Sequence, residues 1–284
     1  MTSNTPRPTR SEQREAARAK AKAMREQQQK GDKRKRVLIQ LGIATSVLVA
    51  VGAVVATIFS ASTQSQAVPT NAIFNDGVKI GAGLQVFTPT FTPTSPTGEV
   101  PIEIVIYVDY QCPICAVFEV PNSEQIKNWV ETGVATLEMH TLSFLDGRGS
   151  PNAFSSRAAN AAMCVAEYSP DNFFDYNTRI FQSQPTEGAP GPENTELISF
   201  AEEVGATNLE SVSSCINNKE FGNWINDSTE RALTEPIPGT QIQISGTPSV
   251  FVNGEQYTWN TLEELASAAR FAAFIQQVTS GGIN

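Results

Sequence analysis

Residues 102–115 read IEIVIYVDYQCPIC, and the predicted fold is built around this stretch. Its first six residues are nearly continuous in apolar and β-branched side chains, which is typical of a central strand buried on both faces. A helix is predicted to begin at Cys112 or Pro113, because proline is tolerated in the first turn of a helix. The sequence therefore places two cysteines, Cys112 and Cys115, where a buried strand passes into a helix.

The spacing of Cys112 and Cys115 predicts a redox pair. Two cysteines three residues apart on the first turn of a helix are close enough to form a disulfide, and the positive end of the helix dipole stabilises a thiolate on the first sulfur. Cys112 should therefore be an exposed nucleophile or leaving group with a low pKa. Cys115, one turn deeper in the helix, should be the shielded thiol that resolves the reaction.

A metal site and a purely structural disulfide are the alternative interpretations of this pair. Half of a zinc site has the same spacing. A closed Cys/His site would need both remaining cysteines, Cys164 and Cys215, which are far apart, and His140 is the only histidine. We therefore expect no metal, and no cofactor is expected either. A structural disulfide is still an alternative if the compartment is oxidising. The position between strand and helix nevertheless favours a reactive pair.

The pattern around the cysteines predicts an α/β domain over residues 74–284. Strands are expected near residues 78–80 and over residues 134–142. Asn253 and Gly254 lie between two further short strands, 249–252 and 256–259, as in a hairpin with a tight turn. Helices are expected at residues 152–168, 172–181, 195–204, 208–216, 220–233 and 261–278. Strands at both ends with helices between them give an α/β sandwich with a helical subdomain inserted at about residues 150–235.

The N-terminal part differs sharply from this domain in charge. Residues 1–36 contain 12 of the 20 Lys and Arg residues against 4 acidic residues, so this arm carries +8 and the remainder of the chain −17. Residues 37–59 are 23 residues without a charge, and at about 1.5 Å per helical residue they reach across a hydrocarbon core of roughly 30 Å. We expect one transmembrane helix there, followed by a tether over residues 60–73.

The basic cluster before the predicted span indicates its orientation. Residues 33–36 read KRKR, and an excess of Lys and Arg stays on the untranslocated side. We therefore expect a single-pass protein of the cell membrane with a cytoplasmic arm and an extracytoplasmic domain. A cleaved signal peptide is the alternative, although the apolar run exceeds the ~7 to 15 residues of the apolar region in a signal peptide. Nucleic acid is not an expected partner, because the arm has no aromatic residue to stack on bases.

Two blocks of sequence together resemble a known family. Residues 108–115 (VDYQCPIC) and 246–254 (GTPSVFVNG) resemble the DsbA-like branch of the thioredoxin superfamily, most of all its membrane-anchored members in Gram-positive bacteria. The resemblance covers about residues 74–280 and implies a thioredoxin-like fold with an inserted helical subdomain. It also implies that Thr247-Pro248 is a cis-proline loop against the cysteines, where Thr247 would offer backbone hydrogen bonds to a substrate peptide. From the residues alone, an ordinary trans proline is equally open.

The residues between the two cysteines depart from the best-known DsbA pattern, which has Pro-His at this place. Here the pair is Pro113-Ile114. Without the imidazole, a Cys112 thiolate loses one hydrogen-bonding and charged partner. We therefore expect Cys112 to be less acidic than in the strongest oxidants, so the sequence alone does not fix the direction of catalysis.

Four further residues call for an interpretation. Cys164 and Cys215 are expected to pair in an oxidising compartment. The resemblance supports this pairing, because similar positions carry a structural disulfide in some related Gram-positive proteins. A second redox-active pair is the alternative. Asp109, three residues before Cys112, could assist proton transfer, but we favour a role in capping the loop. His140 falls within a predicted strand and is expected to be a hydrogen-bonded structural residue.

These observations predict an extracytoplasmic thiol-disulfide oxidoreductase that introduces disulfides into reduced secreted or cell-envelope proteins. The resemblance implies that a quinone-linked membrane partner, similar to the vitamin K epoxide reductase family, reoxidises the pair. A reductase or isomerase with the same fold is one alternative. An anchored, non-enzymatic binding or metal-holding module is the alternative from another class.

Overall fold

The computed structural model describes residues 67–96, 98–148, 150–186, 188–237 and 240–281. The predicted arm at residues 1–36, the predicted span at residues 37–59 and the first half of the predicted tether, residues 60–66, lie outside the described residues. Within the described ranges, no helix combines the length and apolar character needed to cross a membrane.

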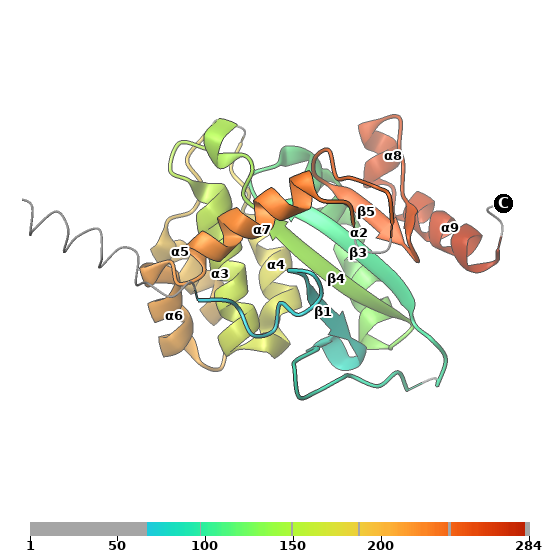
Figure 1. Cartoon of the computed structure of the whole chain (residues 1–284), viewed down its shortest axis with the longest axis horizontal. Helices are drawn as coiled ribbons and strands as arrows, with labels where there is room; N and C mark the ends of the chain where they lie inside the picture. The colour runs from blue at the N-terminus through green and yellow to red at the C-terminus, as the bar shows by residue number, and fades with distance from the viewer. Residues whose placement is uncertain (1–66, 97, 149, 187, 238–239, 282–284) are drawn as a thin grey trace, which may run out of the picture. The chain divides into compact units, whose positions relative to one another are not determined.

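The described part of the chain is built around a mixed sheet whose strands follow the order β2-β1-β4-β3-β5-β6 (Figure 1). The central strand β3 runs parallel to β4 and antiparallel to β5. The strands are β1 (Val78–Gly81), β2 (Gln85–Val86), β3 (Ile102–Asp109), β4 (Ala135–Leu142), β5 (Ser249–Val252) and β6 (Glu255–Gln256). The predicted buried strand is therefore the centre of the sheet, with a neighbour on each side.

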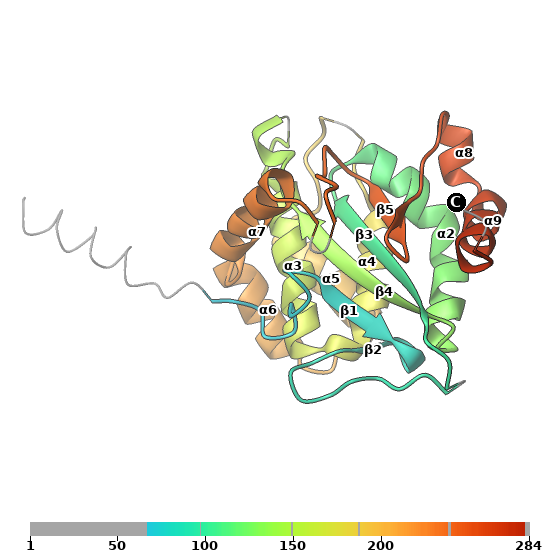
Figure 2. The same ribbon diagram turned by 45° about the vertical axis from the view of Figure 1, so that its right-hand side comes forward.

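The helices form two groups along the chain, one of which is inserted between β4 and β5. Each inserted helix lies within two residues of its predicted bounds. They are α3 (Phe154–Tyr168), α4 (Phe173–Gln182), α5 (Asn194–Glu203), α6 (Leu209–Asn218) and α7 (Gly222–Thr234). The other helices are α2 (Pro113–Glu131), α8 (Leu262–Ala266) and α9 (Ala268–Thr279), and α8 and α9 pack against α2 (Figure 2). The inserted group reaches α2 through α4.

Strand β3 is buried on both faces, as its composition predicts. Ile104, Ile106 and Val108 belong to the main apolar core, and each is fully buried. On the opposite face, Tyr107 packs in a smaller cluster with residues that include Phe251 of β5. Burial of a side chain of this size stabilises the folded state by ~1.5–3 kcal/mol. Packing on both faces therefore holds β3 in place where it leads into the cysteines.

Two predicted elements at the C-terminal end were wrong in extent. The expected helix at residues 261–278 is two helices, because Ser267 has an extended backbone and its hydroxyl accepts the N–H of Arg270, which caps α9. The second strand of the hairpin is only Glu255–Gln256. The predicted turn is present, since Asn253 and Gly254 both have positive φ angles, of 48° and 84°.

Candidate active site

Cys112 stands at the junction of β3 and α2. It has an extended backbone conformation and precedes the first helical residue, Pro113, so it occupies the N-cap position of α2. Its N–H donates to the Asp109 carbonyl at 2.9 Å, and its own carbonyl accepts the N–H of Cys115 at 3.1 Å. The turn between strand and helix therefore directs both cysteines to the same end of the sheet.

Both cysteines of this pair are buried in the described structure, and only Cys112 keeps some exposure to solvent. Cys115 is fully buried, and only 5% of Cys112 is exposed. The expectation of an exposed Cys112 was wrong, because the loop before β5 covers it. Cys112 Sγ lies 3.3 Å from the carbonyl oxygen of Thr247, which is 135 residues further along the chain.

The surroundings nevertheless favour a thiolate on Cys112. A hydrogen bond from the Cys115 thiol lowers the pKa of Cys112 to about 6, against the opposing effect of burial, with further contributions from the Thr247 side chain and the backbone N–H groups of Cys115 and Ile114. The Thr247 hydroxyl is buried and has no partner among the described residues, so it is available to the thiolate. A pKa near 6 is higher than the ~3.5 of the strongest oxidants, in line with the missing imidazole.

Cys115 has the opposite tendency. Burial, and then the neighbouring Cys112, raise the pKa of its thiol well above the ordinary range. The reduced pair therefore holds one proton near neutral pH, on the inner sulfur. This asymmetry suits Cys112 to be attacked or to leave as a thiolate, and Cys115 to remain a protonated thiol.

The loop that covers Cys112 contains the second predicted block. The Thr247-Pro248 peptide bond is cis, and β5 begins at the next residue, Ser249, which pairs with Tyr107 of β3. The structure thus brings Cys112, Cys115, Thr247 and Pro248 together. Ile114, between the cysteines, is 40% exposed and presents an apolar side chain to solvent at this end of the sheet.

Asp109 is a buried carboxyl group that accepts hydrogen bonds from three segments of the chain, one of which is the turn before Cys112. One carboxylate oxygen accepts the Gln111 N–H at 2.9 Å and the Ser155 hydroxyl at 2.7 Å, and the other accepts the Leu145 N–H at 3.1 Å. Burial raises the pKa of Asp109 to about 6 despite these hydrogen bonds, and the charge of Cys112 adds to the rise. Asp109 and Cys112 consequently titrate in the same pH range.

Sequence reasoning missed a second buried carboxyl group, that of Glu119. It lies one turn beyond Cys115 on α2, and one of its oxygens accepts the Asn177 amide at 3.4 Å. Its other oxygen has no partner among the described residues, and burial raises its pKa to about 7. The spacing of four residues from Cys115 was the available signal, since such residues share a helix face.

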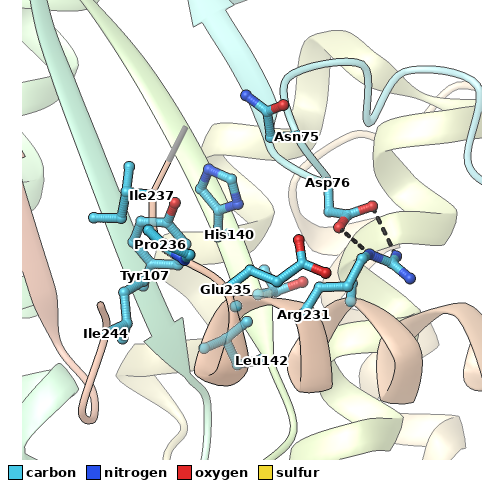
Figure 3. A pocket seen from close by; sticks show the side chains of 13 residues that line it. Asn75, Asp76, Tyr107, His140, Leu142, Arg231, Glu235, Pro236, Ile237 and Ile244 are labelled. Carbon is cyan, nitrogen blue, oxygen red and sulfur yellow. Dashed lines mark hydrogen bonds and ion pairs between the residues drawn. The ribbon is translucent and has the colours of Figure 1, made fainter. Parts of the chain in front are cut away.

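His140 lies in a different part of the molecule. Its ring is stacked on Tyr107 with centroids 4.0 Å apart, and its Nε2 is 2.9 Å from a Glu138 oxygen. Both rings line a cavity of about 290 Å³ that also contains the Asp76–Arg231 ion pair (Figure 3). Neither Cys112 nor Cys115 lines this cavity, so His140 lies apart from the cysteine site.

Cys164 and Cys215 form a disulfide between α3 and α6, with their Cα atoms 5.8 Å apart. Both residues are fully buried. The bridge joins two helices of the inserted group, and neither cysteine forms part of the site around Cys112.

Comparison with known proteins identifies relatives of the same kind. A sequence family described as Thioredoxin matches residues 98–273. The chain is 23% identical over 185 residues to the probable disulfide bond formation protein D of Bacillus anthracis, which covers 64% of this chain and 78% of the relative. It is also 23% identical over 162 residues to the disulfide bond formation protein D of Bacillus subtilis, covering 57% and 67% of the two chains.

Solved structures with the same fold include two from Mycobacterium tuberculosis. The reduced form of the disulfide bond oxidoreductase DsbG is 27% identical, with a TM-score of 0.56 over 73% of this chain and 89% of that one. Oxidised DsbA is 26% identical, with a TM-score of 0.54 over 72% and 92% of the two chains.

Proposed function

Because the chain belongs to the thioredoxin family and is a DsbA-like thiol-disulfide oxidoreductase, we propose that it introduces disulfides into reduced proteins outside the cytoplasm. The observation that supports oxidation of the substrate is the opposite shift in the pKa values of the two thiols. Cys112 is held towards the thiolate and Cys115 towards the thiol. A stabilised thiolate favours the reduced pair and makes the disulfide a better oxidant.

The reaction begins with the Cys112–Cys115 disulfide and a substrate thiolate. The thiolate attacks Cys112 Sγ, forms a mixed disulfide, and displaces Cys115, which takes up a proton because its pKa is high. A second substrate thiolate then attacks the substrate sulfur of the mixed disulfide, and Cys112 leaves as a thiolate. The substrate loses two electrons and gains a disulfide, while the cysteine pair gains the two electrons.

Two neighbours of Cys112 suit an unfolded protein as the substrate. The Thr247 backbone lies against the reactive sulfur, where it can hydrogen-bond to an extended peptide once the loop admits it. Ile114 offers an apolar contact beside the same sulfur. Neither contact requires a particular substrate sequence, which is consistent with reduced secreted or cell-envelope proteins as the clients.

The proposed location depends on the N-terminal sequence. The uncharged stretch 37–59 behind a basic arm would hold the domain at the outer surface of the cell membrane. A membrane-embedded reoxidase, of the type of the vitamin K epoxide reductase family, would then meet the reduced pair and remove its two electrons. Mapping the accessibility of single cysteines placed in the arm and in the domain, in intact cells, tests this topology.

The reduction potential of Cys112–Cys115 tests the direction. A value towards about −120 mV supports the oxidase, whereas a value near −270 mV indicates a reductase. The functional assay is the oxidative refolding of a reduced secreted protein by the full chain. We expect Cys112→Ser to abolish the reaction, and refolding at an undiminished rate by this variant would refute the proposal.

A further inference from the structure

One face of α4 and the residues after it contact the segment that leads into Cys112. Asn177 and Phe181 are four residues apart on α4, so they share one side of the helix. Gln184 lies two residues beyond the last residue of α4. The Asn177 side chain accepts the hydroxyl of Tyr110 at 2.8 Å, and the Phe181 ring packs on the Tyr110 ring with centroids 5.0 Å apart. Gln184 contacts the same segment through its amide.

The Gln184 side chain spans the turn between β3 and α2. Its Nε2 donates to the Tyr110 carbonyl at 2.9 Å and to the Cys112 carbonyl at 2.8 Å. A side-chain amide has two N–H donors, so these two carbonyls use its full donor capacity. Gln184 is 72 residues away from Cys112 in sequence, which means that the inserted helical layer, rather than the turn itself, supplies these bonds.

The peptide group between Tyr110 and Gln111 is held at both ends. Its carbonyl accepts from Gln184, and its N–H donates to the buried carboxylate of Asp109 at 2.9 Å. A peptide plane is rigid, so two side chains bonded to its opposite ends fix its orientation. Two residues further on, the carbonyl of Cys112 accepts both from Gln184 and from the Cys115 N–H. Cys112 is therefore oriented from both sides of its backbone.

We propose that Gln184 is a positioning residue for Cys112, because its amide fixes the turn that aims the sulfur at the start of α2. The inference rests on the proposed role of Cys112 as the attacked sulfur. The two bonds keep the Cys112 sulfur in line with the N–H groups of Ile114 and Cys115. They also place a donor group on the carbonyl oxygens of Tyr110 and Cys112, whose negative ends would otherwise oppose a thiolate.

The test compares two glutamines at the same end of α4. Gln182 is exposed and has no hydrogen bond to the cysteine site among the described residues, so Gln182→Ala is the matched control. Gln184→Met keeps the length of the side chain but removes the donors. Gln184→Glu keeps its shape but replaces the donors with a carboxylate that, when ionised, can only accept. Each variant is made in the full chain, with the Cys112–Cys115 pair reduced.

The readout is the ionisation of Cys112. It is monitored through the ultraviolet absorbance of the thiolate as the pH changes. We expect Gln184→Met to lower the acid ionisation constant of Cys112 roughly tenfold, which raises its pKa by about one unit. Gln184→Glu should raise the pKa of Cys112 further. Gln182→Ala should titrate like the unaltered protein. The two Gln184 variants are independent tests, so one that folds by circular dichroism is enough.

The proposal is overturned if a folded Gln184 variant titrates like the Gln182→Ala control, even when its melting temperature is lower. A lower melting temperature alone would show a purely structural role. The proposed function fails in a different assay, when the unaltered chain does not exchange its disulfide with a reduced protein. The two failures are thus distinguishable, because the titration requires no substrate.

Discussion

The sulfur of Cys112 lies 3.3 Å from the carbonyl oxygen of Thr247. In the thiol form the sulfur donates a hydrogen bond to this oxygen, but a thiolate has no proton to donate and is repelled by it. The charged form must therefore be stabilised by other groups. These groups are the Cys115 thiol, the Thr247 side chain and the first N–H groups of α2. Ionisation of Cys112 thus depends on both blocks of sequence that meet at the site.

The first prediction concerns the reactivity of Cys112 as a function of pH. Hydrogen bonding lowers its pKa to about 6, so the rate of alkylation of the reduced protein by iodoacetamide should be half-maximal near pH 6. A free cysteine would give ~8.5. Mass spectrometry of the products should place the label on Cys112 and leave Cys115 unmodified at neutral pH. A midpoint above pH 8 would contradict the lowered pKa of Cys112.

The second prediction concerns the buried carboxyl group of Glu119. Burial raises its pKa from 4.5 to about 7, so ionisation destabilises the folded state. This destabilisation is absent below the unfolded pKa of 4.5, grows as pH rises, and is complete above about 7. Replacing Glu119 by Gln should therefore stabilise the protein more at pH 8 than at pH 4, by about 3 kcal/mol in the free energy of unfolding.

Urea denaturation at the two pH values measures this difference. The matched control is Glu124→Gln, an exposed residue of the same helix. Because Glu124 is exposed, its replacement should change the free energy of unfolding by no more than about 0.5 kcal/mol at either pH. An equal effect of Glu119→Gln at pH 4 and pH 8 would show that Glu119 ionises normally in the folded protein.

How well the sequence predicts each part of this site depends on how far apart the contacting residues lie along the chain. The strand β3, the start of α2 and the inserted helices follow from local apolar patterns and from Pro113, and their observed bounds lie close to the predicted ones. The burial of Cys112 cannot be predicted from the residues next to it in sequence, because it depends on the distant residue Thr247. The roles of Glu119 and Gln184 depend on the packing of α4 against the active-site segment. A sequence pattern contains no information on that packing angle.

The third prediction separates the roles of the two active-site cysteines. In Cys115→Ala, a substrate that has formed a mixed disulfide with Cys112 cannot be released by the inner thiol. Mixed disulfides should therefore accumulate in cells and appear as adducts on non-reducing gels that disappear on reduction. Cys112→Ser should give no adducts, because the buried Cys115 is not accessible to protein thiols. Adducts that persist in Cys112→Ser but not in Cys115→Ala would reverse the assignment.

The last prediction concerns the Cys164–Cys215 disulfide, which joins α3 and α6 across a sequence separation of 51 residues. Closing a loop of this length stabilises the folded state by about 4 kcal/mol in the chain-entropy model. The double variant Cys164→Ala, Cys215→Ala should lose stability of that order in urea denaturation while it still oxidises a reduced protein at a temperature where it is folded. The bridge is buried away from Cys112, so a structural role leaves the exchange chemistry intact. Loss of reoxidation or exchange in the folded double variant would instead make these cysteines a second redox pair that passes electrons to the first.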